Sequence, residues 1–215
     1  CFDGDEITAM RTGAASGVAT KFFAAPKSKL LAIFGTGAQA FTQVEAMMCV
    51  RPIEKIFVFS RNLKSSKTFS NSVSEILTIN ATPGILENLK EADIICTATP
   101  SKKELFNLSN VKEGVHINAI GSFKSDMIEI SSDIIKNSKT IVDSLVSSKK
   151  EAGDLIQAEK NSSWDYENIF AELGSITKNK IYHKEYIQQN SLFKSVGLGF
   201  QDLVLTELLL KKIGK

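Results

Sequence analysis

The sequence is poor in cysteine, and its few cysteines form no recognisable pattern. Cys1, Cys49 and Cys96 are the three cysteines of 215 residues, an odd number without the close spacing of metal ligands. A disulfide framework is therefore excluded, and no metal site is predicted. This usage is typical of reduced thiols, so we expect a cytoplasmic protein.

Long apolar runs and an excess of one charge are also missing. No apolar run approaches the roughly 18 residues of a membrane-spanning helix, and the opening Cys1–Glu6 is acidic and lacks the apolar core of a signal peptide. The 26 basic and 24 acidic side chains give a net charge of +2 without a basic stripe. Neither nucleic acid nor a membrane is an expected partner. The opening on Cys rather than Met favours an internal start within a longer protein.

The sequence does contain a regular alternation of short apolar runs with helix-like stretches. The apolar runs predict strands at residues 29–34, 56–59, 93–97, 116–120 and 140–143. Helices are predicted at 38–50, 65–77 and, as a short turn, 87–91. Alternation of this kind indicates a parallel sheet with crossover helices. We therefore predict the α/β class, with a Rossmann-like doubly wound parallel sheet.

The two ends of the chain differ from this middle part. Residues 12–24 are rich in small side chains and predict a closely packed helix, and residues 197–213 carry leucine and valine at helical spacing. We predict a connecting helix at 1–25, a dinucleotide-binding Rossmann domain at 26–190 and a C-terminal helix at 191–215. Both ends are expected to lead to a second domain, for substrate binding and dimerisation, that is mostly absent from this sequence.

A glycine-rich turn follows the first predicted strand. Gly35-Thr36-Gly37-Ala38-Gln39-Ala40 fits the pattern G-x-G-x-x-G/A and stands between a strand and a helix. In this pattern Gly35 permits the tight turn, Gly37 lets a pyrophosphate approach the backbone, and Ala40 allows close helix packing. The helix start offers free N–H groups to the phosphates. The turn predicts dinucleotide binding, and the alternative is a structural tight turn.

The end of the second predicted strand bears on which dinucleotide binds. An acidic residue there would hold the ribose 2′-hydroxyl of NAD, but this chain has Ser60-Arg61-Asn62. Without a carboxylate, a 2′-phosphate is not repelled, and Arg61 is a suitable partner for it. NADP(H) is therefore favoured and NAD(H) remains possible; the alternative is that Arg61 is a solvated surface residue.

Three further segments, together with the glycine-rich turn, carry a resemblance to a known family. They are residues 8–17 (TAMRTGAASG), 114–122 (GVHINAIGS) and 193–203 (FKSVGLGFQDL). In this order they resemble the successive motifs of the ornithine cyclodeaminase/mu-crystallin family. The resemblance implies an NAD(P)-dependent enzyme that acts on a small amino acid, imino acid or ketimine, and a homodimer in the full-length protein.

The resemblance also implies roles for individual residues. Arg11 matches the arginine that meets substrate carboxylate and cofactor, which suits a guanidinium, and Val196 is expected at the substrate. Other positions are expected to contact the cofactor: Thr12, Gly35, Thr36, Gly37, Ala38, Gln39, Ser60, Arg61, Asn62, Thr97, Ile117, Asn118, Ala119, Ile120 and Ser195. For Asn118 a structural role inside the sheet is the alternative, and His116 is interpreted as a packed histidine.

One position departs from the family pattern. The aspartate that acts as acid and base in ornithine cyclodeaminases is matched here by Phe123, and a phenyl ring transfers no proton; Asp126 is a weak substitute. The catalytic residue is therefore unknown, and a lysine that the family places near the substrate would lie before this sequence. Glu151 and Asp154 are interpreted as structural.

Four functions remain open. Hydride transfer at the α-carbon of an amino or imino acid is the leading hypothesis. Conversion of ornithine to proline and ammonia is the second, weakened by Phe123. Non-catalytic NADP binding is the third. A different Rossmann reductase is the fourth, although it leaves residues 11–15 and 195–197 unexplained.

Overall fold

The computed structural model describes residues 3–161, 164–179 and 188–214. Eight parallel strands form one sheet in the order β3-β2-β1-β4-β6-β10-β8-β9. Their bounds are β1 (Leu30–Phe34), β2 (Lys55–Phe59), β3 (Asn80–Pro83), β4 (Ile94–Thr97), β6 (His116–Ala119), β8 (Lys139–Val142), β9 (Ile169–Glu172) and β10 (Ser191–Lys194). The doubly wound α/β prediction is confirmed, and the order reverses between β1 and β4, where such sheets bind ligands.

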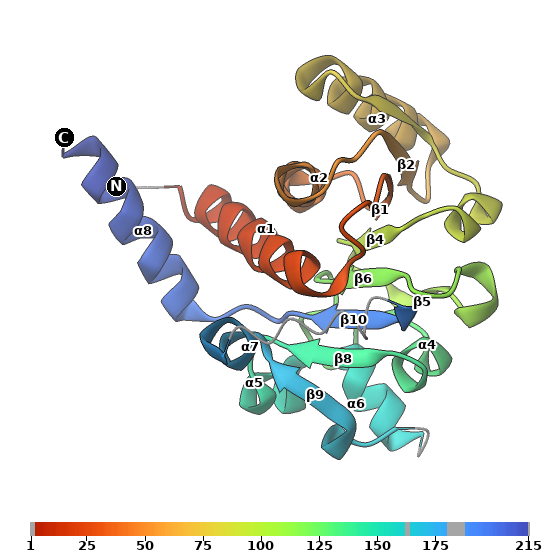
Figure 1. Cartoon of the computed structure of the whole chain (residues 1–215), viewed down its shortest axis with the longest axis vertical. Coiled ribbons are helices and arrows are strands. Elements are labelled where there is room, and N and C mark those ends of the chain that lie inside the picture. The colour runs from red at the N-terminus through yellow and green to blue at the C-terminus, as the bar shows by residue number, and fades with distance from the viewer. Residues whose placement is uncertain (1–2, 162–163, 180–187, 215) are drawn as a thin grey trace.

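Helices cover both faces of this sheet (Figure 1). On one face α1 (Gly4–Phe23), α2 (Ala38–Val50), α3 (Leu63–Leu77) and α7 (Leu173–Asn179) pack on residues such as Ile33, Val58 and Phe193. The opposite face is covered by the short helices η1 (Leu86–Lys90), η2 (Leu108–Asn110), α4 (Ser132–Lys136), α5 (Leu145–Glu151), α6 (Gly153–Lys160) and η3 (Tyr166–Asn168). Because both faces are buried, β1, β2 and β4 are apolar along almost their whole length, which is why sequence patterns find strands of this kind.

The sequence prediction was wrong about residues 191–194. They were assigned to a C-terminal helix beyond the sheet, but β10 lies in the middle of the sheet, between β6 and β8. The segment has only two apolar residues, Leu192 and Phe193, flanked by the polar Ser191 and Lys194. All four are buried, and a buried partner, Asp154, lies 2.7 Å from the Lys194 ammonium. A long-range ion pair of this kind leaves no local signal in the sequence.

Helix α1 begins inside the connecting helix predicted at 1–25, eight residues before the stretch rich in small side chains. The Asp3 side chain accepts hydrogen bonds from Asp5 N and Glu6 N and so caps its start. Its small residues let α1 pack directly on α2, since a Cβ at Gly13 would lie 2.8 Å from Thr42 O. Close packing of this helix was predicted, but its partner was not. The last carbonyls of α1, including those of Thr20 and Ala24, accept hydrogen bonds from the buried Arg51 guanidinium.

Helix α8 (Gly199–Ile213) stands beside α1 and apart from the sheet (Figure 1). Its apolar residues are largely exposed: Leu203 and Ile213 keep 68% and 72% of their surface. Among the described residues, no helix combines the length and apolar character needed to cross a membrane.

His116 is packed inside the sheet, as predicted. Its two ring nitrogens lie 2.8 Å from Ser191 Oγ and 3.2 Å from Asn118 Oδ1. Burial lowers the pKa of His116 to about 3, against the opposing effect of the Asn118 hydrogen bond. The imidazole is therefore neutral at physiological pH and stands apart from the pocket described below.

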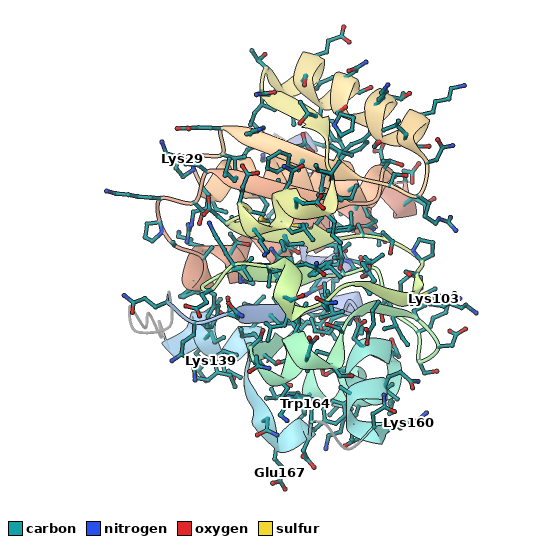
Figure 2. All side chains as sticks on the ribbon, turned by 90° about the vertical axis from the view of Figure 1, so that its right-hand side faces the viewer. Lys29, Lys103, Lys139, Lys160, Trp164 and Glu167 are labelled. Atoms are coloured by element: carbon teal, nitrogen blue, oxygen red, sulfur yellow. The ribbon has the colours of Figure 1, made fainter. Side chains whose placement is uncertain are left out.

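In Figure 2 the amino and carboxyl edges of the sheet lie on opposite sides of the view. Lys29 and Lys139, at the starts of β1 and β8, lie on one side of the view, and Lys103, after the end of β4, lies on the other. Lys29 pairs with Glu54 at 2.6 Å on the surface of the amino edge. The only tryptophan, Trp164, is buried against Tyr166 below these strands and serves packing.

Candidate functional site

The glycine turn between β1 and α2 has the geometry that its sequence predicts. Gly35 has φ +113° and donates its N–H to Phe59 O at 3.0 Å. A Cβ at Gly35 would lie 2.4 Å from Ala98 O, so only glycine fits. At Gly37, which caps α2, a Cβ would meet no atom of the described residues within 4 Å. The protein itself therefore does not require glycine at Gly37, whereas a close-bound ligand would.

A pocket of about 420 Å³ opens beside this turn, at the carboxyl edge of the sheet. Six residues predicted for substrate or cofactor line it: Arg11, Thr12, Gln39, Ile120, Ser195 and Val196. They come from α1, from the first turn of α2 and from the ends of β6 and β10. Segments almost 190 residues apart in sequence thus converge where doubly wound sheets bind their ligands.

Arg11 is fixed in this pocket by the start of α8. Its Nε donates to Asp202 Oδ1 at 3.0 Å, and its Nη1 lies 3.5 Å from Gln201 Oε1. The side chain of Arg11 keeps only 14% of its exposure. Two acceptors therefore orient a guanidinium that is already partly withdrawn from water, where charges attract more strongly. The Asp202 carboxylate offsets part of the positive charge, and Nη2 has no hydrogen-bond partner within the described residues.

The loop after β10 is held by a carboxylate that the sequence analysis missed. Asp143, at the end of β8, accepts hydrogen bonds from Ser195 Oγ (2.9 Å), Val196 N (2.9 Å) and Gly197 N (2.7 Å). The hydroxyl hydrogen of Ser195 is therefore used in a hydrogen bond within the protein. Asp143 is the last residue of the predicted strand 140–143, and this position at the carboxyl end was the available signal.

Gln39 provides a polar atom without a partner in the described part of the chain. Its Oε1 is buried and accepts no hydrogen bond there, although Gln39 lines the pocket. Buried polar atoms are normally satisfied, so an orphaned acceptor at a pocket wall points to a ligand donor. Together with Gly37, it shows that the turn fits a dinucleotide.

Several predicted cofactor residues do not present their side chains to the pocket. Ile117, Asn118 and Ala119 are fully buried within β6, and the Asn118 amide donates to Thr20 Oγ1 at 2.9 Å on the α1 side. Thr97 is also buried, and its hydroxyl group donates to Glu129. Any contact of these four residues with a ligand would have to be made through the backbone.

The residues predicted to read the ribose lie at a separate place. Ser60, Arg61 and Asn62 follow β2 and are exposed. Asn62 caps α3 by accepting the Lys64 N–H at 2.8 Å. They stand at the carboxyl edge beyond the glycine turn, on the β2 side, so Arg61 remains a prediction for the 2′-phosphate.

Phe123 lies at the pocket with 46% of its surface exposed. Asp126 does not replace the missing aspartate, because it pairs with Lys102 on the surface at 2.6 Å and is not among the residues that line the pocket. Of the described pocket-lining residues, only Arg11 is ionisable. These walls therefore supply an anion-binding group, hydroxyl groups and apolar surface, but no carboxyl, imidazole or amine group to act as an acid or a base.

Six further residues of the pocket wall were not among the predicted site residues. Thr8 lies one helical turn before Arg11, and the others follow strands: Ala98, Thr99 and Pro100 after β4, Gly121 after β6 and Gly197 after β10. A position directly after the predicted strands 93–97 and 116–120 was a usable signal, since parallel sheets bind ligands at that edge. The predicted contacts along β4 ended at Thr97, its last residue.

A doubly wound parallel sheet with a glycine turn after its first strand and a pocket over its carboxyl edge defines a Rossmann-type α/β protein. Within that class, the chain belongs to the ornithine cyclodeaminase/mu-crystallin family, whose model matches residues 1–214. The resemblance expected from the four sequence motifs is confirmed.

Two curated relatives show the similarity in sequence. The chain is 36% identical over 217 residues to a Delta(1)-pyrroline-2-carboxylate reductase of Bacillus cereus, covering 98% of this chain and 65% of that protein. It is 34% identical over 207 residues to the ketimine reductase mu-crystallin of Macropus fuliginosus, covering 96% and 62%. The chain thus spans somewhat less than two thirds of the length of these relatives.

Two solved structures show the similarity in fold. The Delta(1)-pyrroline-2-carboxylate reductase of Thermococcus litoralis, in complex with NADH and L-proline, matches with a TM-score of 0.91 and 38% identity, over 96% of this chain and 64% of that one. An archaeal alanine dehydrogenase dimer with bound NAD matches with a TM-score of 0.88 and 30% identity, over 95% and 63%.

Proposed function

We propose that this chain is the cofactor-binding part of an NAD(P)H-dependent reductase of small imino acids. One observation carries the proposal: an anion-binding arginine and the turn of a dinucleotide site meet in one pocket of about 420 Å³. The reductases among the relatives support it. The pocket volume suits a small substrate beside one end of a dinucleotide.

Different residues of the chain would bind different parts of the cofactor. Backbone N–H groups at the start of α2 would hold the pyrophosphate, with Gly37 giving it access. Gln39 Oε1 would accept a hydrogen bond from the bound cofactor, and Ser195 and Ile120 would border its reactive end. When bound, a reduced nicotinamide supplies a hydride. The protein contributes position and charge to that transfer.

Arg11 would hold the substrate carboxylate. Its Nε is fixed by Asp202, so its remaining N–H groups point in a defined direction, as a fork suited to a carboxylate. Phe123, Pro100 and Val196 line the same pocket and offer apolar contact to the carbon skeleton. The pocket thus suits a compact imino acid with one carboxylate, such as a cyclic ketimine, that carries no second charged end.

Reduction is favoured over cyclodeamination by the chemistry of the walls. Ring closure with loss of ammonia needs proton transfer to and from nitrogen, but Phe123 stands where the aspartate is expected and transfers none. Reduction of an iminium carbon needs no further proton from the described residues, because the nitrogen already carries it. Cyclodeamination and non-catalytic binding therefore rank second and third.

The function is tested with the complete gene product and Δ1-pyrroline-2-carboxylate. We expect one NAD(P)H to be consumed for each imino acid reduced, followed through the loss of NAD(P)H absorbance. Ammonia release from ornithine without net NAD(P)H consumption would instead establish cyclodeamination. Tight NAD(P)H binding without turnover on either substrate would establish a binding protein.

Arg61 is proposed to select NADP(H) by pairing with the 2′-phosphate. No carboxylate follows β2 to repel that phosphate, and Arg61 is exposed at the strand end. Arg61→Ala is expected to weaken NADPH binding by about 1.5–3 kcal/mol, the worth of a charge-assisted hydrogen bond, and to leave NADH binding unchanged. Lys103→Ala, an exposed cation on the strand of residues 102–106, is the matched control. An unaltered ratio of NADPH to NADH affinity in Arg61→Ala would remove the assignment.

We further propose that the protein works in the cytosol as a homodimer. Cys49 and Cys96 are free thiols, which suits a reducing compartment. The dimer is supported by the archaeal alanine dehydrogenase, whose solved structure is a dimer. Likewise, we propose that residues 1–25 and α8 connect the sheet to a substrate and dimerisation domain.

A further inference from the structure

A fully buried carboxylate lies behind the pocket and takes no part in the function described above. Glu129 stands on β7 (Ile128–Ile130), which pairs with β5 (Lys102–Phe106) in a separate two-stranded sheet. None of its surface is exposed. Burying a carboxylate is costly unless hydrogen bonds replace its water, so the groups around it indicate what it does.

Five donors surround the Glu129 carboxylate, from the end of β4 and from the loops after β4 and β6. From the β4 side, Thr97 Oγ1 donates to Oε2 at 2.9 Å, and Thr99 donates to Oε1 through N at 2.7 Å and Oγ1 at 2.8 Å. From the β6 side, Gly121 N and Ser122 N donate to Oε2 at 2.8 and 3.1 Å. Oε1 therefore accepts from the loop after β4, and Oε2 accepts mainly from the loop after β6. The single Glu129 side chain thus links the two loops.

Three of these donors are backbone amides that lie just past the ends of strands. Thr99 follows β4, and Gly121 and Ser122 follow β6. Gly121 N also donates to Thr97 O at 3.1 Å, so Thr99 N and Ser122 N are the amides that depend most on Glu129. An unpaired buried amide costs about as much as a lost hydrogen bond. An apolar side chain at Glu129 would fill the volume but leave these amides without this acceptor.

The two loops also touch each other at this point. A Cβ at Gly121 would lie 2.3 Å from both Thr99 N and Thr99 O and 2.6 Å from Glu129 Oε1. Thr99 and Gly121 both line the pocket, and Phe123 follows directly. A shift of either loop would therefore move the pocket wall.

A buried ion pair supports Glu129 from behind. Asp154 Oδ1 accepts hydrogen bonds from Glu129 N at 2.6 Å and Ile130 N at 3.0 Å, and Asp154 Oδ2 lies 2.7 Å from Lys194 Nζ. Lys194 directly precedes Ser195 of the pocket. Burial raises the pKa of Glu129, and the positive charge of Lys194 opposes that rise and favours the carboxylate that five donors require.

We propose that Glu129 is a positioning residue that clamps the loops after β4 and β6 in the shape that binds the nicotinamide end of the cofactor. The proposal rests on the proposed function for the identity of the ligand. The clamping of the loops by Glu129 does not depend on which ligand binds, so the clamp and the cofactor are tested by separate measurements.

The test compares Glu129→Gln with the unmodified chain. Glutamine keeps the volume, but its NH₂ group replaces one acceptor, so one of the two loops loses its partner. Glu104→Gln is the matched control, because Glu104 is exposed on β5 of the same small sheet. Hydrogen exchange at Thr99, Gly121 and Ser122 is measured first, and NADH binding second, well below the melting temperature of each variant.

In Glu129→Gln, exchange of at least one loop's amides and the dissociation constant for NADH are each expected to rise about tenfold or more, the factor that one charge-assisted hydrogen bond represents. Exchange in β1 and β2 and all properties of Glu104→Gln should stay unchanged. Unchanged exchange in both loops, or uniformly faster exchange with unaltered NADH affinity, would overturn the proposal. If the unmodified chain binds no NADH, the proposed function fails, and the exchange data alone decide whether the clamp exists.

A milder variant keeps the proposal testable if Glu129→Gln does not fold. Thr97→Val removes one donor of five and keeps the shape of a buried side chain. We expect a smaller rise, about twofold to fivefold, in exchange at Gly121 and in the dissociation constant. No rise in either quantity would contradict the clamp.

Discussion

Gly37→Ala is expected to fold like the unmodified chain and to bind NADH at least about tenfold more weakly, a loss of about 1.4 kcal/mol. The added methyl group meets no described atom of the protein within 4 Å, so packing is unaffected. It would instead stand where a pyrophosphate must approach the start of α2. The measurement is a fluorescence titration with NADH beside a thermal melt.

Gly4→Ala is the matched control for this substitution. Gly4 is also at the start of a helix, and a Cβ there likewise meets no atom within 4 Å. Gly35→Ala is the opposite case, because its Cβ would lie 2.4 Å from Ala98 O, and it should unfold at a lower temperature. Equal NADH affinity in Gly37→Ala and Gly4→Ala would show that no phosphate lies against the turn.

Lys194→Met is expected to lower the free energy of unfolding by about 3–5 kcal/mol, because it leaves a buried carboxylate without its cation. Lys194 and Asp154 lie 2.7 Å apart with no exposed side-chain surface. The measurement is the midpoint of urea unfolding, with the slope of the transition checked for constancy. Adding Asp154→Asn to this variant should restore part of the loss, since the amide oxygen still accepts from β7.

Lys29→Met is the comparison for Lys194→Met. Lys29 and Glu54 form an ion pair of similar length, 2.6 Å, but their side chains are 52% and 61% exposed. Its loss should change the free energy of unfolding by only about 0–1 kcal/mol. If the two variants differ by less than about 1 kcal/mol, burial of the Lys194 pair is not what stabilises β10.

The parts of the fold that the sequence predicts are those with local causes. Ala38–Val50 was predicted as a helix with its observed bounds, because a glycine turn begins it and Arg51-Pro52 ends it. The five apolar runs became β1, β2, β4, β6 and β8 because strands buried on both faces are mostly apolar, although β6 also carries the buried His116 and Asn118. The glycine turn and Arg11 were located by the same local patterns.

The parts that the sequence did not predict depend on distant partners. β10 is polar at both ends and becomes a central strand through Lys194 and Asp154, which lie 40 residues apart in sequence. β3 and β5 have four and five residues, at least half of them polar, and β7 and β9 are mostly apolar but have only three and four residues. Short strands of this kind carry no periodic signal.

The supporting groups of the site were missed for the same reason. Asp143 and Glu129 hold the loops of the pocket, yet neither stands in a glycine motif or beside Arg11 in the sequence. Asp154 was correctly interpreted as structural, but its partner was not identified. Buried carboxylates that accept backbone amides at strand ends are a tertiary feature, visible only once the strands are in order.

The central claim is that the turn after β1 binds a nicotinamide dinucleotide. Titration of the purified, folded chain with NADH and with NADPH, followed by cofactor fluorescence, tests it most directly. We predict saturable binding of one dinucleotide per chain, competed by the oxidised cofactor and weakened by Gly37→Ala. A chain that shows cooperative unfolding yet binds neither dinucleotide would contradict the account.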